Sequence, residues 1–126
     1  MALAVRSAGL TGADIGFVHA HATATPLGDR NESGAIVEAI GDHPAVTSTK
    51  SVTGHLLGAS GALGTLAAVR ALREGMLPPT VNLDEPDPEI RVDVVSGSAR
   101  PTDAQAALVN AFGFGGHNVS LVLTRD

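Results

Sequence analysis

The only lysine of the chain, Lys50, and a histidine five residues later, His55, stand in a turn of small residues between an extended segment and a long apolar one. The apolar segment, ending at Gly75, predicts a buried helix with His55 at its N-terminus. Unpaired N–H groups and the helix dipole disfavour positive charge there, which predicts a neutral imidazole near pH 7. Such a ring can donate a hydrogen bond to a carbonyl or enolate oxygen; the alternative is an exposed lysine beside a structural histidine.

Two other loops carry groups that could join this chemistry. His21 follows an apolar strand expected over 15–20, and a glycine-rich turn, 112–117, follows another strand. The carboxyl ends of strands in an open α/β sheet meet at one edge, so we expect the three loops to converge. The turn is either an ordinary hairpin or a loop that offers N–H groups to an oxyanion or moves a phenylalanine.

A metal site is the alternative for the histidines. His19 and His21 alternate along the expected strand, and His43 and His117 could be recruited. No acidic residue stands near enough in sequence to complete the site, so we predict no metal and a packed, polar role for His19.

The elements that must position these loops alternate between strand and helix. We expect strands over 15–20, 45–49, 91–96, 106–112 and 119–124, and helices over 29–40 and about 55–75, with the tail of another helix before Gly9. Glu32 is explained as part of a capping box, with a supporting role at the site as the alternative. The order βαβαβββ predicts an α/β fold with a mixed five-stranded sheet, two helices and right-handed crossovers.

Composition excludes several classes of function. With 126 residues, 44% apolar and 17% charged, the chain is expected to form one globular domain. A net charge of -5 offers no basic surface for nucleic acid, and the absence of cysteine excludes disulfides and a cysteine nucleophile supplied by this chain. The apolar segment 56–69 is too short for a membrane span, and no signal-peptide pattern precedes it, so a cytoplasmic location is expected. Small residues at Gly54, Gly58 and Ala62 predict a tightly packed partner for the central helix.

Three motifs, in this order, carry a resemblance: HATATP (21–26), STKSVTGHLLGASGA (48–62) and NAFGFGGHN (110–118). Together they resemble the C-terminal half of the β-ketoacyl-acyl carrier protein synthases, condensing enzymes of the KAS I/II type in the thiolase superfamily. The resemblance runs over almost the whole chain and implies a half-domain, 1–126, of the thiolase-like fold. It implies the decarboxylative Claisen condensation of an acyl-enzyme with malonyl-carrier protein.

The resemblance also implies roles for individual residues. His21 and His55 would polarise the malonyl thioester carbonyl, and Lys50 would be the active-site lysine. Thr23 and Thr25 would line the phosphopantetheine tunnel. The backbone N–H of a gating Phe114 would join the oxyanion hole. Gly113 and Gly115 would contact the substrate, and Glu32 would support the catalytic residues without touching the substrate.

Two positions depart from the pattern. Such synthases usually carry a glutamate where this chain has Gly64, and an asparagine where it has His19. The nucleophilic cysteine would belong to an N-terminal half, so we expect this chain alone to be inactive. The expected partners are that half, acyl carrier protein and a second copy in a homodimer; no cofactor is expected beyond the phosphopantetheine that carries the substrates. The alternative is a non-catalytic thiolase-fold partner similar to a chain-length factor.

Overall fold

The computed structural model describes residues 1–125, and its centre is a five-stranded sheet. The strands are β1 (Phe17–His19), β2 (Ala45–Thr47), β4 (Asp93–Val94), β6 (Ala106–Phe112) and β7 (Asn118–Thr124). Their order is β4-β2-β1-β6-β7, with β7 antiparallel to β6 and the remaining pairs parallel. The predicted mixed five-stranded sheet is confirmed.

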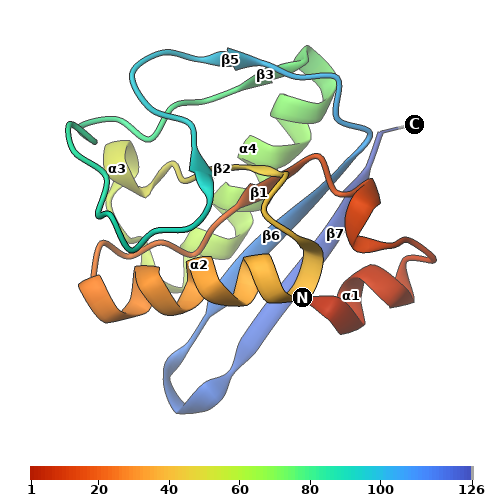
Figure 1. The fold of residues 1–126 in the computed structure, drawn as a ribbon, viewed down its shortest axis with the longest axis horizontal. Helices are drawn as coiled ribbons and strands as arrows, with labels where there is room; N and C mark the ends of the chain where they lie inside the picture. The colour runs from red at the N-terminus through yellow and green to blue at the C-terminus, as the bar shows by residue number, and fades with distance from the viewer. Residues whose placement is uncertain (126) are drawn as a thin grey trace.

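Helices cover both faces of the sheet (Figure 1). Helix α2 (Pro26–Ile40) and the short α1 (Ala2–Ser7) pack on one face, where Val18, Ile36 and Leu108 belong to one apolar core. Helix α4 (Ser60–Glu74) packs on the other face, against a second core that includes Phe17 and Val109. Side chains alternate between the two faces along each strand. Because helices cover both faces, both sets of side chains of β1 and β6 are buried, which explains why these strands are mostly apolar.

Both long helices end where the sequence predicts. Gly41 follows α2 with φ of 104°, and Gly75 caps α4 in the left-handed conformation with φ of 65°. Glycine reaches this region without a side-chain clash, so both positions stop a helix.

The starts of both helices differ from the prediction. Helix α2 begins at Pro26, not at Asp29, because proline is well tolerated in the first turn, where its missing N–H is not needed. The capping box assigned to Glu32 is therefore wrong, since Glu32 lies in the second turn of the helix. Helix α4 begins at Ser60, so His55 does not stand at its N-terminus.

The segment before α4 holds two short elements instead of a continuous helix. Lys50 begins the one-turn helix α3 (Lys50–Thr53), and a 3-10 turn, η2 (Leu57–Ala59), follows. Gly54 has φ of 70° and Leu57 has φ of 51°, and neither value is compatible with a right-handed helix. These two residues separate the turn that carries Lys50 and His55 from α4.

The proline-rich connector, 78–92, crosses the molecule beside α3 and α2. Strand β3 (Met76–Leu77) precedes it and pairs with β5 (Arg100–Pro101) in a small second sheet that was not predicted. Short 3-10 turns at η1 (Gly12–Asp14) and η3 (Phe114–Gly116) complete the elements.

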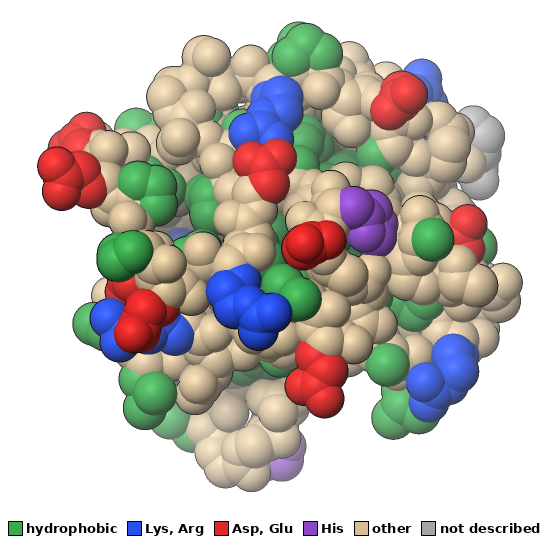
Figure 2. Space-filling view, viewed as in Figure 1, with side chains coloured by type: hydrophobic (Ala, Val, Ile, Leu, Met, Phe, Trp, Pro, Cys, Tyr) green, Lys and Arg blue, Asp and Glu red, His purple; other side chains and the backbone are tan. Residues whose placement is uncertain are grey.

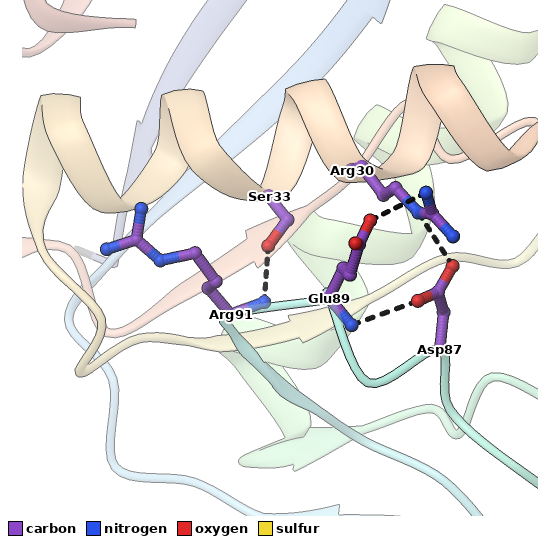
Figure 3. A network of polar contacts seen from close by, with 5 residues as sticks. All are labelled: Arg30, Ser33, Asp87, Glu89 and Arg91. Carbon is purple, nitrogen blue, oxygen red and sulfur yellow. Dashed lines mark hydrogen bonds and ion pairs between the residues drawn. The ribbon is translucent and has the colours of Figure 1, made fainter.

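Polar contacts fasten the connector to α2 (Figure 3). The guanidinium of Arg30 pairs with Asp87 at 2.9 Å and with Glu89 at 2.6 Å, and the buried Ser33 hydroxyl accepts the Arg91 N–H at 2.7 Å. These contacts hold the connector over the sheet edge at which β2 ends.

Charged side chains of both signs are dispersed over the face shown in Figure 2, with no gathering of lysine and arginine. Within the described residues, no helix is long and apolar enough to cross a membrane.

Candidate active site

The ring of His55 is oriented by the first turn of η2 and by Ser60. Its Nδ1 accepts the N–H of Leu57 at 3.2 Å and lies 2.8 Å from the Ser60 hydroxyl. The same hydroxyl oxygen accepts the N–H of Leu56 at 2.8 Å, so its own proton is directed to the ring. An Nδ1 that accepts hydrogen bonds leaves the proton of a neutral imidazole on Nε2. The predicted N–H donor is therefore present, but local hydrogen bonds create it and not the helix dipole.

The loop that carries His21 is held by Glu32. The backbone N–H groups of His21 and Ala22 donate to the two carboxylate oxygens of Glu32, each at 2.8 Å. Asn110 donates to the same carboxylate at 3.0 Å and accepts from the Ser120 hydroxyl at 2.8 Å. This buried chain of polar contacts ties the loop after β1 to α2, β6 and β7. The supporting role that the sequence left as an alternative for Glu32 is the one its contacts fit.

Backbone strain is concentrated in the same loop. Ala22 has φ of 34° and Ala24 has φ of 61°, values that cost a residue with a side chain about 1 kcal/mol or more. The Glu32 contacts on the neighbouring N–H groups offset this cost and hold the loop in one conformation.

His21 and His55 come together as expected from the sequence. Their ring centroids are 5.6 Å apart, edge to face, and the ring of Phe112 lies 5.5 Å from that of His21. Burial, followed by the charge of Lys50, lowers the pKa of His21, which favours a neutral imidazole near pH 7. The pair therefore presents two imidazoles suited to hydrogen bonding at one place.

Lys50 lies at the same edge, at the start of α3, and is half-buried. Burial lowers the pKa of its ammonium group, while Glu32 and Asp29 act in the opposite direction. Burial, followed by Glu32, raises the pKa of Asp29, and the Asp29 Oδ1 atom is buried with no hydrogen-bond partner among residues 1–125. The site thus holds one amine and two carboxylates near the histidine pair.

Two clefts meet at these residues. One, of about 680 Å³, is lined by Lys50 and His55 and walled by the connector; the other, of about 850 Å³, is lined by His21 and Phe112. Their shared walls are Ala22, Thr23, Asp29 and Glu32. The histidine pair therefore lies between two openings, each large enough for part of an extended ligand.

The remaining predicted site residues are less closely gathered. The hydroxyls of Thr23 and Thr25 are 3.5 Å apart, and Thr23 lines both clefts. Phe114 is 97% exposed and lines none of the described clefts. Gly113 and Gly115 flank it, and the N–H of Gly113 donates to the His117 carbonyl at 2.8 Å, which closes the turn. The phenylalanine ring that contacts His21 is that of Phe112.

Four residues were not predicted from the sequence to have a role at the site: Asp29, Ser60, Asn110 and Phe112. Asn110 is the one polar residue in the apolar run of β6, and a buried amide needs partners, so this signal was available. Ser60, Asp29 and Phe112 carry no such signal, because their roles arise from contacts between distant elements or from the unpredicted break before α4.

The histidines considered for a metal do not gather. His43 bonds the Ile15 carbonyl at 3.1 Å, and His117 lies in the turn between β6 and β7. Over residues 1–125, no group of three or more His, Cys, Asp or Glu side chains is arranged to hold a metal ion. The lack of a bound metal stays a prediction for the purified protein.

Comparisons with known proteins agree on one family. Residues 1–84 match the family described as "Beta-ketoacyl synthase, C-terminal domain". A curated relative, the 3-oxoacyl-[acyl-carrier-protein] synthase 2 of Synechocystis sp., is 46% identical over 128 residues, which cover 99% of this chain and 31% of the relative. The chain therefore spans about a third of the length of this relative.

Solved structures give the same result. A β-ketoacyl synthase from Burkholderia phymatum superposes with a TM-score of 0.97 at 39% identity, over all of this chain and 31% of the other. The ishigamide ketosynthase/chain length factor gives 0.94 at 39% identity, over 98% of this chain and 31% of the other. A type II polyketide ketosynthase in complex with its acyl-carrier protein gives 0.91 at 29% identity, with the same two coverages. The five-stranded sheet and its helices are those of the thiolase-like ketosynthases.

Proposed function

Because this chain belongs to the C-terminal domain family of the β-ketoacyl synthases, we propose that it forms the malonyl-binding and decarboxylating part of a condensing enzyme. The reaction is the condensation of an acyl-enzyme with malonyl-carrier protein in fatty acid or polyketide synthesis. The observation that carries the proposal is the edge-to-face pair of His21 and His55, in which Nδ1 of His55 accepts two hydrogen bonds and Nε2–H remains as a donor.

In the proposed reaction, the two imidazoles donate hydrogen bonds to the thioester carbonyl oxygen of the malonyl group. The bond between the malonyl carboxylate and methylene carbons breaks, CO₂ leaves, and the electron pair forms an enolate. Neutral N–H donors stabilise the developing oxyanion without giving up a proton. The enolate carbon attacks the acyl thioester, a new carbon–carbon bond forms, and the thiolate leaves.

The thiolate must come from another segment. Acyl transfer of this kind needs a cysteine nucleophile, and the chain has none. We therefore assign the nucleophile to an N-terminal half, as the resemblance implies, and assign the isolated chain no condensing activity.

The chain's partner is acyl carrier protein, because the curated relative is named for it and one superposable ketosynthase was solved bound to it. Thr23 lines both clefts, and its hydroxyl lies 3.5 Å from that of Thr25, so we assign both threonines to contacts with the phosphopantetheine arm. Homodimerisation, the gating role of Phe114, the roles of Gly113 and Gly115 and a cytoplasmic location stay predictions.

The second candidate is a non-catalytic partner of a ketosynthase, similar to a chain-length factor. Two observations favour it: Gly64 stands where the enzymes usually carry a glutamate, and one superposable structure is a ketosynthase/chain length factor. A catalytic test of His55 separates the two candidates.

The test uses the chain reconstituted with an N-terminal half that supplies the cysteine. His55→Ala should lower malonyl decarboxylation by roughly 10²- to 10³-fold, as does the loss of one oxyanion-hole donor. Acyl loading should change much less, because attack by the cysteine does not need the malonyl site. Radiolabelled malonyl-carrier protein measures CO₂ release, and an acyl-carrier protein substrate measures loading.

His43→Ala is the matched control, because His43 is outside the two clefts at the site and bonds the Ile15 carbonyl. It should leave both steps intact. Condensation that survives His55→Ala, or a reconstituted wild type that neither loads nor condenses, would favour the chain-length-factor candidate.

A further inference from the structure

The two positions at which the sequence departs from the resemblance, His19 and Gly64, touch each other. His19 is the last residue of β1 and is 2% exposed; its ring lies against α4 at Gly64. A Cβ at position 64 would lie 2.9 Å from both Cε1 and Nδ1 of that ring and 3.6 Å from a methyl group of Val109. Carbon atoms do not approach this closely, so any other residue at 64 must displace the imidazole.

The same ring also contacts the turn that carries Lys50. Nε2 of His19 accepts the backbone N–H of Thr49 at 3.3 Å and lies 3.1 Å from its hydroxyl. Thr49 is the N-cap residue of α3, whose first residue is Lys50. The imidazole therefore spans from the backbone of α4 to the start of α3.

We propose that Gly64 and His19 are a matched pair that positions Lys50. His19 acts as a positioning residue through Thr49, and Gly64 supplies the space without which the ring cannot reach Thr49. The catalytic importance of this position rests on the proposed function, but the contact itself does not.

The electrostatics suit this role. A ring that accepts a hydrogen bond at Nε2 must be neutral, and burial, followed by the charge of Lys50, lowers the pKa of His19 to about 4. The acceptor is thus kept across the neutral range. Lys50 in turn faces Glu32 and Asp29 of α2, so a shift of α3 changes both the burial of its amine and its distance from two carboxylates.

The test follows the titration of Lys50 by NMR. Because the chain has a single lysine, ¹³Cε-labelled lysine gives one resonance to follow against pH. The chain is measured alone. If the isolated chain self-associates, it is measured in complex with an unlabelled N-terminal half. Gly64→Ala should raise the pKa of Lys50 by roughly half a unit or more, because a displaced His19 releases α3 and the amine becomes less buried.

Gly61→Ala is the matched control on the same helix. A Cβ there would lie 3.8 Å from the nearest atom, the Cβ of Ala111, which is an ordinary contact. It should leave the Lys50 titration unchanged. Combining Gly64→Ala with His19→Gln should restore the wild-type titration, because a flexible amide can yield to the new methyl group and still accept the Thr49 N–H.

A second pair of variants keeps the test valid if Gly64→Ala fails to fold. At unchanged Gly64, His19→Gln keeps an acceptor near the Nε2 position and should preserve the Lys50 titration, whereas His19→Leu removes it and should shift the titration. Equal titrations in wild type, Gly64→Ala and His19→Leu would overturn the proposal.

Activity of the reconstituted protein tests a different claim. If Lys50 serves the condensation, Gly64→Ala should lower kcat several-fold with KM for malonyl-carrier protein unchanged. Unchanged kcat beside a shifted Lys50 titration would contradict the catalytic role assigned to Lys50 and leave the positioning pair standing.

Discussion

At the scale of single residues, the site is set by hydrogen bonds to imidazole nitrogens. His55 accepts the Leu57 N–H at Nδ1, and His19 accepts the Thr49 N–H at Nε2. Each backbone donor fixes one tautomer, so the two rings have different roles. His55 keeps Nε2–H as a donor for a ligand, whereas Nε2 of His19 accepts a structural hydrogen bond. The residue type alone does not separate these roles, because both histidines follow small or apolar residues at strand or turn ends.

The burial of His19 predicts a pH dependence of stability. Its folded-state pKa is lowered to about 4 from an ordinary value of 6.5, so the unfolded chain binds more protons between these pH values. Its contribution is fully present above about pH 6.5 and is lost as pH falls to about 4. The loss is at most about 3 kcal/mol, since one pKa unit corresponds to about 1.4 kcal/mol.

Denaturant unfolding of the reconstituted protein from pH 7.5 to 4 measures this effect. His19→Gln should remove most of the fall in the free energy of unfolding over that interval, because glutamine does not titrate. The other groups titrate alike in both proteins, so the difference isolates His19. His117→Gln, in the exposed turn, should keep the wild-type fall; a wild-type curve matching that of His19→Gln would contradict the prediction.

At the scale of elements, the strands and the helix ends could be predicted, and the helix starts could not. Short, mostly apolar or β-branched runs identified all five strands of the main sheet, and Gly41 and Gly75 marked both stops. The break before α4 depends on positive φ at Leu57, which no pattern of residue types reveals. Because the break was missed, His55 was assigned a helix dipole that the structure does not give it, and Ser60 was not recognised.

The residues that could do chemistry at the site were easier to predict from the sequence than the residues that hold them in place. The motifs brought His21, His55 and Lys50 to one edge, and the contacts agree for the two histidines. For Glu32 the capping box is wrong, and the contacts of its carboxylate fit the supporting role that the sequence kept as the alternative. Asn110 and the His19–Gly64 contact join residues from different elements, and such pairings require the fold.

The connector predicts a test at the same scale. Arg30 pairs with Asp87 and Glu89 at the surface, and exposed ion pairs add little to global stability. Arg30→Ala should hardly change the thermal midpoint, but it should free the connector that walls the cleft of Lys50 and His55. Limited proteolysis with a Glu-specific protease should therefore cut the Glu89–Ile90 bond several-fold faster; the Glu85–Pro86 bond resists this protease because proline follows the glutamate.

Arg70→Ala is the matched control, because Arg70 pairs with Glu74 within α4 and does not touch the connector. Its cleavage rate should equal that of the wild type. If Arg30→Ala is cut no faster than Arg70→Ala, the Ser33 contact to the Arg91 backbone is sufficient to hold the connector.

At the scale of the whole molecule, the two cores are closed but part of the surface is apolar. The outer side of α4 and the segment before it expose large apolar side chains, including Leu66 at 57% and Leu57 at 74%, with Val52 and Leu56 beside them in sequence. Exposed apolar side chains concentrated along one segment are typical of a surface that contacts another protein. This is the segment in which the glycine spacing predicted a tightly packed partner, although Gly61 and Gly64 themselves face β6 and β1.

This surface predicts that the chain by itself associates. Burial of each large apolar side chain contributes about 1.5–3 kcal/mol, so several on one segment favour self-association at micromolar concentration. Size-exclusion chromatography with light scattering should show oligomers or aggregates for the chain alone, and a defined complex once the N-terminal half is added. Leu66→Lys should reduce self-association of the isolated chain and weaken the complex, whereas Arg73→Lys, also exposed on α4, should change neither. A monodisperse monomer that melts cooperatively and ignores the N-terminal half would contradict both this prediction and the assignment of the chain to one part of a larger condensing enzyme.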